Sequence, residues 1–90
     1  MANHKSAIKR DRQSKVRRLR NRMYKSKMKT VIRRVEEALV AGAEDQAKEA
    51  LALAVPVIQK TAAKGTIHKK NASRKVSRLT RRVNRMQPLG

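Results

Sequence analysis

The 90-residue chain has no cysteine, no tryptophan, no phenylalanine and only one tyrosine. Without cysteine it can form neither disulfides nor thiolate metal sites. With one aromatic residue it has no ring platform on which single-stranded bases could stack. Two histidines and six carboxylates leave few groups for metal binding or acid–base chemistry. We therefore expect no metal, no cofactor, no small-molecule substrate and no enzymatic activity.

Large apolar residues are also scarce, since Val, Ile and Leu together occupy 18 positions. The longest uncharged, mostly apolar stretch runs from Ala50 to Ile58 and contains Pro56, so it is too short to span a membrane. The basic start of the chain leads into no apolar segment and does not read as a secretory signal. These absences predict a soluble cytoplasmic protein with no membrane partner. At this length, residues 1–90 form at most one small domain.

Positive charge, in contrast, is abundant: 25 Lys and Arg against six Asp and Glu give a net charge of +19. Residues 1–34 carry a net +13 with Asp11 as their only acid, residues 35–63 carry −3, and residues 64–90 carry +9. This block pattern predicts that the middle of the chain packs while both ends meet a polyanion. Repulsion between such charges also disfavours a homo-oligomer.

Apolar residues recur at helical spacing in three segments, and no alternating strand pattern is present. The first helix is predicted from about Ser6 to Ala41, the second begins near Glu44 and Asp45, and the third follows Gly65. Gly42 and Gly65 are expected to end the first two helices in the left-handed conformation. Pro56 is expected to kink the second helix without ending it. The apolar faces are predicted at Tyr24, Met28, Val31, Val35 and Ala38; at Ala47, Ala50, Leu51, Ala54, Ile58 and Ala62; and at Ala72, Val76, Leu79, Val83 and Met86.

Three amphipathic helices with short connections predict an all-α, antiparallel three-helix bundle. The first helix would be about 54 Å long and the others about 30 Å, so it overhangs the bundle by roughly 20 Å. Its apolar stripe is dense only after Tyr24, so the overhang is the basic N-terminal half, where the stripe thins to Ile8, Val16, Leu19 and Met23. We expect residues 1–22 to be disordered or frayed without a binding partner.

The basic ends favour nucleic acid over the two alternatives. A solvated helical face normally alternates Glu with Lys, and a membrane-surface helix needs bulky apolar residues opposite its charge. Basic side chains lie all round the predicted overhang, which suits structured RNA with several converging helices better than a single DNA duplex. A DNA-compacting protein remains the alternative reading at this point.

The segment from Lys64 to Asn71 contains a second cationic cluster. Lys69 and Lys70 stand near the start of the third helix, where they oppose its dipole. A bound phosphate would reverse that penalty, because free backbone N–H groups, the dipole and the lysines all favour an anion. The plainer alternative is that Thr66 or Asn71 caps the helix and the lysines are solvated. His68 has no paired carboxylate near it in the sequence, so we expect a helix-start residue or an RNA contact rather than a catalytic base.

Two motifs resemble the bacterial small-subunit ribosomal protein family S20: the start Met1–Arg10, and Pro56–Lys60 followed by Ala63–Arg74. Length, charge and the three-helix layout agree with that family. Two departures are mild: His4 stands where an apolar residue is frequent, and Asn71 stands one place later than the usual Asn.

The resemblance implies a structural component of the small (30S) subunit that binds 16S rRNA directly and acts early in its assembly. It also implies a long first helix inserted among rRNA helices. By position, the basic N-terminal half and residues 64–74 would contact rRNA. The residues expected to do so are Lys5, Lys9, Arg10, Arg12, Lys15, Arg17, Arg18, Arg20, Arg22, Lys25, Lys29, Lys64, His68, Lys69, Lys70, Asn71, Arg74 and Arg78.

Overall fold

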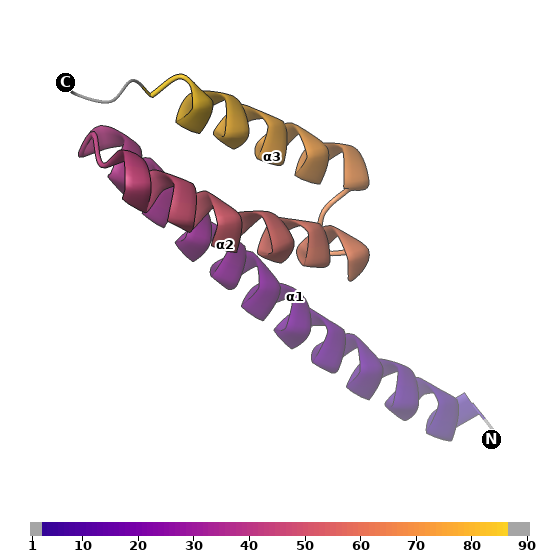
Figure 1. Cartoon of the computed structure of the whole chain (residues 1–90). Coiled ribbons are helices and arrows are strands. Elements are labelled where there is room, and N and C mark those ends of the chain that lie inside the picture. The colour runs from indigo at the N-terminus through magenta and orange to yellow at the C-terminus, as the bar shows by residue number, and fades with distance from the viewer. Residues whose placement is uncertain (1–2, 87–90) are drawn as a thin grey trace.

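Three helices make up the part of the chain that the structure, a computed structural model, describes: the backbone of residues 3–86 and the side chains of residues 7–86. They are α1 (Asn3–Val40), α2 (Glu44–Ala63) and α3 (Lys69–Asn84), and no strand occurs within residues 3–86. The chain reverses direction twice, so α2 lies between α1 and α3, which contact each other little (Figure 1). The predicted all-α bundle with a long first helix is confirmed.

Both reversals are built on a glycine in the left-handed conformation, as expected. Gly42 has φ 70° and Gly65 has φ 77°. After α1 the N–H of Ala43 donates to the carbonyl of Ala38 at 3.0 Å, and after α2 the N–H of Thr66 donates to the carbonyl of Thr61 at 3.2 Å. These hydrogen bonds satisfy carbonyls that the helix ends would otherwise leave without partners. The chain can therefore turn within a few residues at each end of α2.

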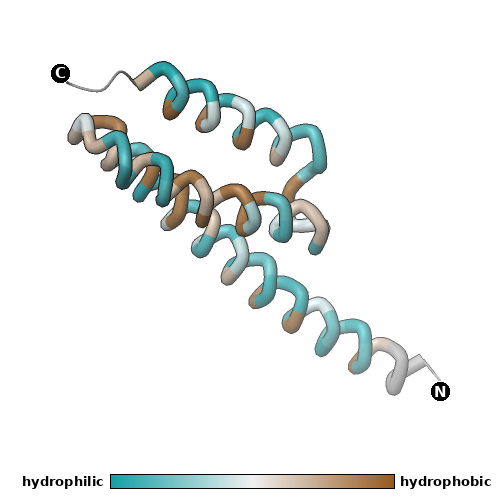
Figure 2. Tube along the Cα trace, in the orientation of Figure 1, coloured by the Kyte–Doolittle hydropathy of each residue, from teal (hydrophilic) through white to brown (hydrophobic). Residues whose placement is uncertain are grey.

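The core is formed by the predicted apolar faces of the three helices, and α2 lies at the centre of that core. Figure 2 shows that α2 is the most apolar helix, whereas α3 and the N-terminal half of α1 are mostly hydrophilic. Val35, Ala54 and Ile58 are fully buried, and Val83 is 2% exposed. Small side chains such as Ala54 let neighbouring helices approach α2 closely. The buried apolar residues are Met28, Val31, Val35, Ala38, Ala47, Ala54, Ile58, Ala72, Leu79 and Val83.

Two positions in α2 differ from the simple apolar pattern. Thr61 is fully buried although it is polar, because its hydroxyl donates to the carbonyl of Val57 at 2.7 Å and is thereby satisfied within the helix. Leu53, although large and apolar, is 60% exposed. The helix continues through Pro56, which is itself exposed. Ala52, whose carbonyl has no donor at position 56, is exposed as well and can be hydrated there.

The N-terminal half of α1 leaves the bundle entirely. Every side chain from residue 7 to residue 20 is exposed, and among the described side chains of α1 Met28 is the first that is buried. With 38 residues, α1 is about 57 Å long, against about 30 Å for α2. The longest dimension of the molecule is accordingly 73 Å. We call residues 7–20 the overhang.

One expectation for the overhang is wrong. Ile8, Val16, Leu19 and Met23 do not continue the core stripe of α1, since they are 51–64% exposed. The five-residue step from Met23 to Met28 turns the helix by about 140°. Measured at about 100° per residue, the four apolar side chains centre about 120° from the middle of the buried face of α1. Ile8 and Leu19 lie nearly opposite the core, whereas Val16 and Met23 lie at its flank. We call Ile8, Val16, Leu19 and Met23 the outer stripe.

Candidate nucleic-acid interface

Four predicted contact residues form a single row along α1, where the helix leaves the bundle. Arg18, Arg22, Lys25 and Lys29 step by 4, 3 and 4 residues, so they lie on one face over about 16 Å. All four are exposed, and they line an open hollow together with Asn21 and Ser26. No carboxylate interrupts this basic row. Its four charges repel one another in the free protein and favour a chain of phosphates.

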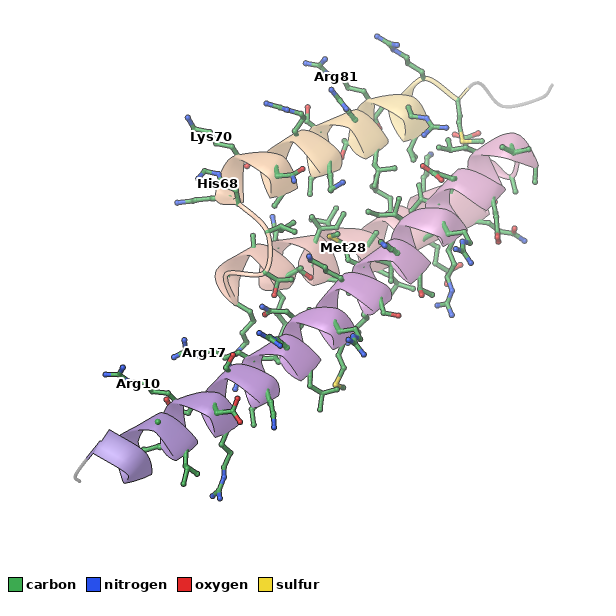
Figure 3. All side chains as sticks on the ribbon, turned by 180° about the vertical axis from the view of Figure 1, so that it is seen from behind. Arg10, Arg17, Met28, His68, Lys70 and Arg81 are labelled. Atoms are coloured by element: carbon green, nitrogen blue, oxygen red, sulfur yellow. The ribbon has the colours of Figure 1, made fainter. Side chains whose placement is uncertain are left out.

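A hydrogen bond between side chains fixes the connection from α2 to α3 against α1 beside this row. The hydroxyl of Thr66 donates to Oδ1 of Asn21 at 3.0 Å, across 45 positions in the sequence. Both residues are half-buried. The bond holds Lys64, His68 and Lys69 at the end of the bundle from which the overhang emerges (Figures 1 and 3). Asn21 is absent from the residues predicted from the sequence, because no local pattern marks a partner so far along the chain.

Replacing Thr66 by Val is expected to lower the free energy of unfolding by about 1 kcal/mol, because it deletes this bond and leaves the half-buried Asn21 oxygen without its partner. Urea unfolding measures the change. Thr30→Val is the matched control, since the Thr30 hydroxyl bonds only within its own exposed turn, to the Ser26 carbonyl at 2.9 Å. Equal losses in the two variants would contradict the role given to the Asn21–Thr66 bond.

The start of α3 is capped by His68. Its backbone is extended (φ −70°, ψ 143°), and its Nδ1 accepts a hydrogen bond from the N–H of Lys70 at 3.1 Å. The alternative caps considered from the sequence are wrong: Thr66 bonds Asn21, and Asn71 is the third residue inside the helix. Lys69 and Lys70 are exposed, and no acidic residue occupies the first turn. In the neutral tautomer that accepts at Nδ1, His68 carries its proton on Nε2 and can donate it to a phosphate.

The remaining predicted residues of α3 point elsewhere. Arg74 and Arg78 are exposed on the face opposite the buried Ala72, Leu79 and Val83. Figure 3 shows Lys70 and Arg81 on this outer face, directed away from α2. The structure therefore does not bring this part of α3 together with the basic row. An anion on this face would lie on the far side of the bundle from α1.

In the overhang, cationic side chains are distributed around the helix. Arg10 and Arg17 project to the side on which α2 and α3 lie further along, as Figure 3 shows. The one acid, Asp11, pairs with Lys15 at 3.2 Å, but both side chains are about two-thirds or more exposed, so the pair contributes little. Lys5 lies in α1, and its side chain falls outside the described residues. The other predicted contacts in this part are Lys9, Arg12 and Arg20, all exposed.

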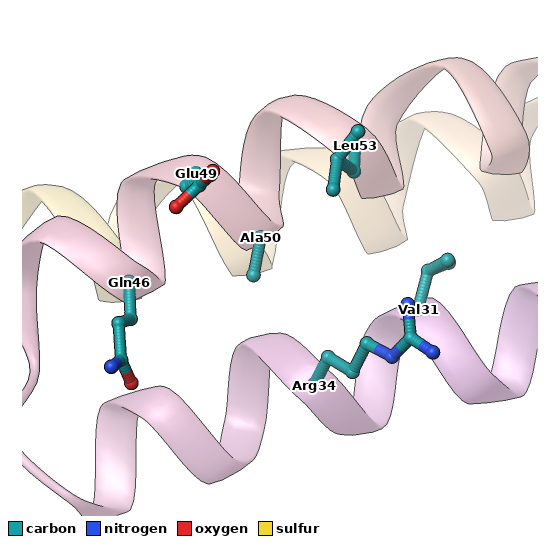
Figure 4. A pocket seen from close by; sticks show the side chains of 6 residues that line it. All are labelled: Val31, Arg34, Gln46, Glu49, Ala50 and Leu53. Carbon is teal, nitrogen blue, oxygen red and sulfur yellow. The ribbon is translucent and has the colours of Figure 1, made fainter.

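The hollow between α1 and α2 offers no comparable concentration of charge. Its lining includes one guanidinium, that of Arg34, and one carboxylate, that of Glu49, beside the apolar Val31, Ala50 and Leu53 (Figure 4). Within the described residues, no three His, Asp or Glu side chains are grouped so that they could hold a metal ion. Over the same residues, none of the three helices has an apolar stretch of membrane-spanning length.

Comparison with known proteins places the whole of this interface within a single family. The family model for ribosomal protein S20 matches residues 2–84. The small ribosomal subunit protein bS20 of Desulfotalea psychrophila is 60% identical over 84 residues, which cover 93% of this chain and 94% of that protein. Proteins of the same name from Syntrophobacter fumaroxidans and Geobacter sulfurreducens are 57% and 56% identical, each over 93% of this chain and at least 97% of their own length.

The matched region contains the overhang, the basic row, the α2–α3 connection and the outer face of α3. Apart from Met1, it also contains the two motifs on which the sequence resemblance depends, so that resemblance is confirmed. The relatives of this chain are ribosomal proteins. This agrees with the expectation that the chain is a structural protein and not an enzyme. The chain belongs to the ribosomal protein S20 family, and its relatives named above are proteins of the small ribosomal subunit.

Proposed function

We propose that this chain binds 16S rRNA directly, as a single copy within the small ribosomal subunit, and stabilises the folding of that RNA during assembly. The observation that supports this best is the uninterrupted basic row beside the cationic α2–α3 connection, with the two held together by the Asn21–Thr66 hydrogen bond. The names of its relatives place them in the small subunit. As a ribosomal protein, the chain would act in the cytoplasm.

The proposed mechanism is electrostatic and structural. Phosphates that converge in a folded RNA repel one another, and a helix with cations on several sides lowers that repulsion from each side at once. Each phosphate neutralised by Lys or Arg also releases condensed counterions, which makes binding steeply dependent on salt. The overhang, the basic row and the outer face of α3 point in different directions. They are suited to separate segments of one folded RNA rather than to one straight duplex.

A binding competition distinguishes this function from DNA compaction. The full chain is titrated with a folded fragment of the 16S rRNA 5′ domain and with duplex DNA carrying the same number of phosphates, at several salt concentrations. We expect at least a hundredfold preference for the rRNA at moderate salt, since specific sites typically exceed non-specific ones by more than this. Equal affinity for the two nucleic acids, or an rRNA affinity that does not change with salt, would refute the proposal.

The overhang is proposed to be ordered by its RNA partner. Residues 7–20 make no buried contact, and an isolated helix of this length is marginal in water. Amides of the overhang should therefore exchange with solvent within seconds in the free chain and at least tenfold more slowly in the rRNA complex, while those of Val35 and Ile58 are protected in both. Equally slow exchange of the overhang in the free and bound forms would contradict this prediction.

A further inference from the structure

The outer stripe has no partner within the protein, although it consists of large apolar side chains. Ile8 is 58% exposed, Val16 51%, Leu19 60% and Met23 64%. These residues follow one another along one side of α1, turned by about 120° from its buried face. Beyond Met23 the same side of the helix continues into an open hollow lined by Met23, Ser26, Thr30 and Arg34. Without a binding partner all of this apolar surface stays exposed to water, which costs free energy in proportion to its area.

Cations border the outer stripe on both sides. At about 100° per residue, Lys15 and Arg22 lie along one edge, while Lys9 and Arg20 lie along the other. Arg12 occupies the middle of the stripe, between Ile8 and Val16, and is exposed. The surface is therefore an apolar strip between two rows of positive charge. A ligand that fits this surface has a less polar surface of its own between two rows of negative charge.

We infer that the outer stripe lies along the minor groove of an RNA double helix, with its apolar side chains against the riboses. This inference rests on the proposed rRNA binding and adds the face of α1 and the groove concerned. In A-form RNA the minor groove is wide and shallow, and a phosphate backbone runs along each edge. Aliphatic side chains can cover the C–H surface of the sugars. The bordering lysines and arginines reach the phosphates, and Arg12 can donate to 2′-hydroxyls or base-edge acceptors.

Other occupants fit the same surface less well. The minor groove of B-form DNA is only about 6 Å wide and does not admit a helix. A lipid interface would draw the guanidinium of Arg12 toward the acyl chains along with Ile8 and Val16, and the stripe has no aromatic anchor. A second copy of the chain would bring two segments of net charge +13 together. Charge complementarity thus selects duplex RNA.

Leu19→Gln and Leu53→Gln provide a matched test, because both leucines are helical and 60% exposed, but Leu53 lies on α2 and lines the hollow between α1 and α2 (Figure 4). The substitution removes no charge and changes helix propensity little. Affinity for the folded 16S rRNA fragment should fall about tenfold for Leu19→Gln, as expected when one buried leucine contact is lost, and should be unchanged for Leu53→Gln. The salt dependence of binding should be the same for both variants and the unmodified chain.

Hydroxyl-radical footprinting on the same complexes identifies the groove, because the radical attacks ribose hydrogens. The unmodified chain should protect riboses across the minor groove of one RNA helix, and Leu19→Gln should lose part of that protection. If the unmodified chain binds the rRNA but the two variants have equal affinities, the inference is wrong and the proposed function stands. If the unmodified chain does not bind, the proposed function itself fails. Leu19-dependent binding to anionic vesicles, or Leu19-dependent self-association, would overturn the inference in favour of a lipid surface or a second copy.

Discussion

Replacing the basic row by glutamine (Arg18, Arg22, Lys25 and Lys29→Gln) is expected to weaken binding to the 16S rRNA fragment by a factor on the order of a thousand at 0.1 M salt. Each neutralised phosphate contact releases nearly one counterion, so losing four contacts should reduce the slope of log affinity against log salt by about 3. Glutamine keeps the helix propensity of Arg and Lys, so the fold should survive. Filter binding or fluorescence anisotropy across a salt series measures both quantities.

The control for this variant removes the same charge elsewhere. Arg34, Lys48, Lys60 and Arg82→Gln also deletes two lysines and two arginines, all of them exposed, none among the predicted contacts and none on the outer face of α3. Both variants have a net charge of +15, four less than the +19 of the unmodified chain. The control should retain most of the affinity and of the salt slope. If the two variants lose the same amount of affinity, binding depends on total charge and not on where the charges lie, and the interface described above is wrong.

Replacing Ile58 by Ala is expected to lower the free energy of unfolding by about 2–5 kcal/mol. Ile58 is fully buried in α2, the helix against which both other helices pack. Only ten apolar residues of the described part are buried, and four of them are alanines, so little neighbouring side chain can move into the space. The loss is a large fraction of the 5–15 kcal/mol typical of a whole domain. Circular dichroism should show a midpoint lowered by about 8–40 °C, at 4–8 °C per kcal/mol for a domain of this size.

Leu53→Ala serves as the companion variant, because Leu53 lies on the same helix but is 60% exposed. Its melting temperature should change by only a few degrees. Adding the rRNA fragment should raise the midpoint of Ile58→Ala, since a ligand that binds only the folded state stabilises it by mass action. A midpoint for Ile58→Ala within a few degrees of the unmodified chain would show that the three helices do not share one core.

Much of the fold can be predicted from the helical spacing of apolar residues and from the positions of glycine. The steps from Tyr24 to Ala38 and from Ala72 to Met86 identify the buried faces of α1 and α3, because helical spacing places such residues on one side. Gly42 and Gly65 mark the chain reversals, because glycine adopts positive φ without a steric penalty. The overhang follows from helix length alone, since α1 is nearly twice as long as α2.

Other features of the structure could not be predicted from sequence patterns. Asn21 and Thr66 are 45 residues apart, and either one, taken alone, resembles an ordinary surface polar residue. The apolar residues of the overhang look like a thinned continuation of the core stripe, but at about 100° per residue they are turned by about 120° from it. The expected place of His68 at the helix start is confirmed, but its capping hydrogen bond could not be predicted, because Thr66 and Asn71 are the more usual caps. Of these features, only the Asn21–Thr66 contact required the helices to be placed relative to one another.

The most direct test of the central claim, that the basic surfaces of this chain bind rRNA in the small subunit, is co-sedimentation. Small subunits from which the native S20 protein has been removed are mixed with the purified full chain, and the mixture is centrifuged through a sucrose gradient at moderate salt. We predict that the chain migrates with the small subunits at one copy each, and that the basic-row variant stays at the top of the gradient. Recovery of the unmodified chain at the top, or equal co-sedimentation of the two proteins, would contradict the claim.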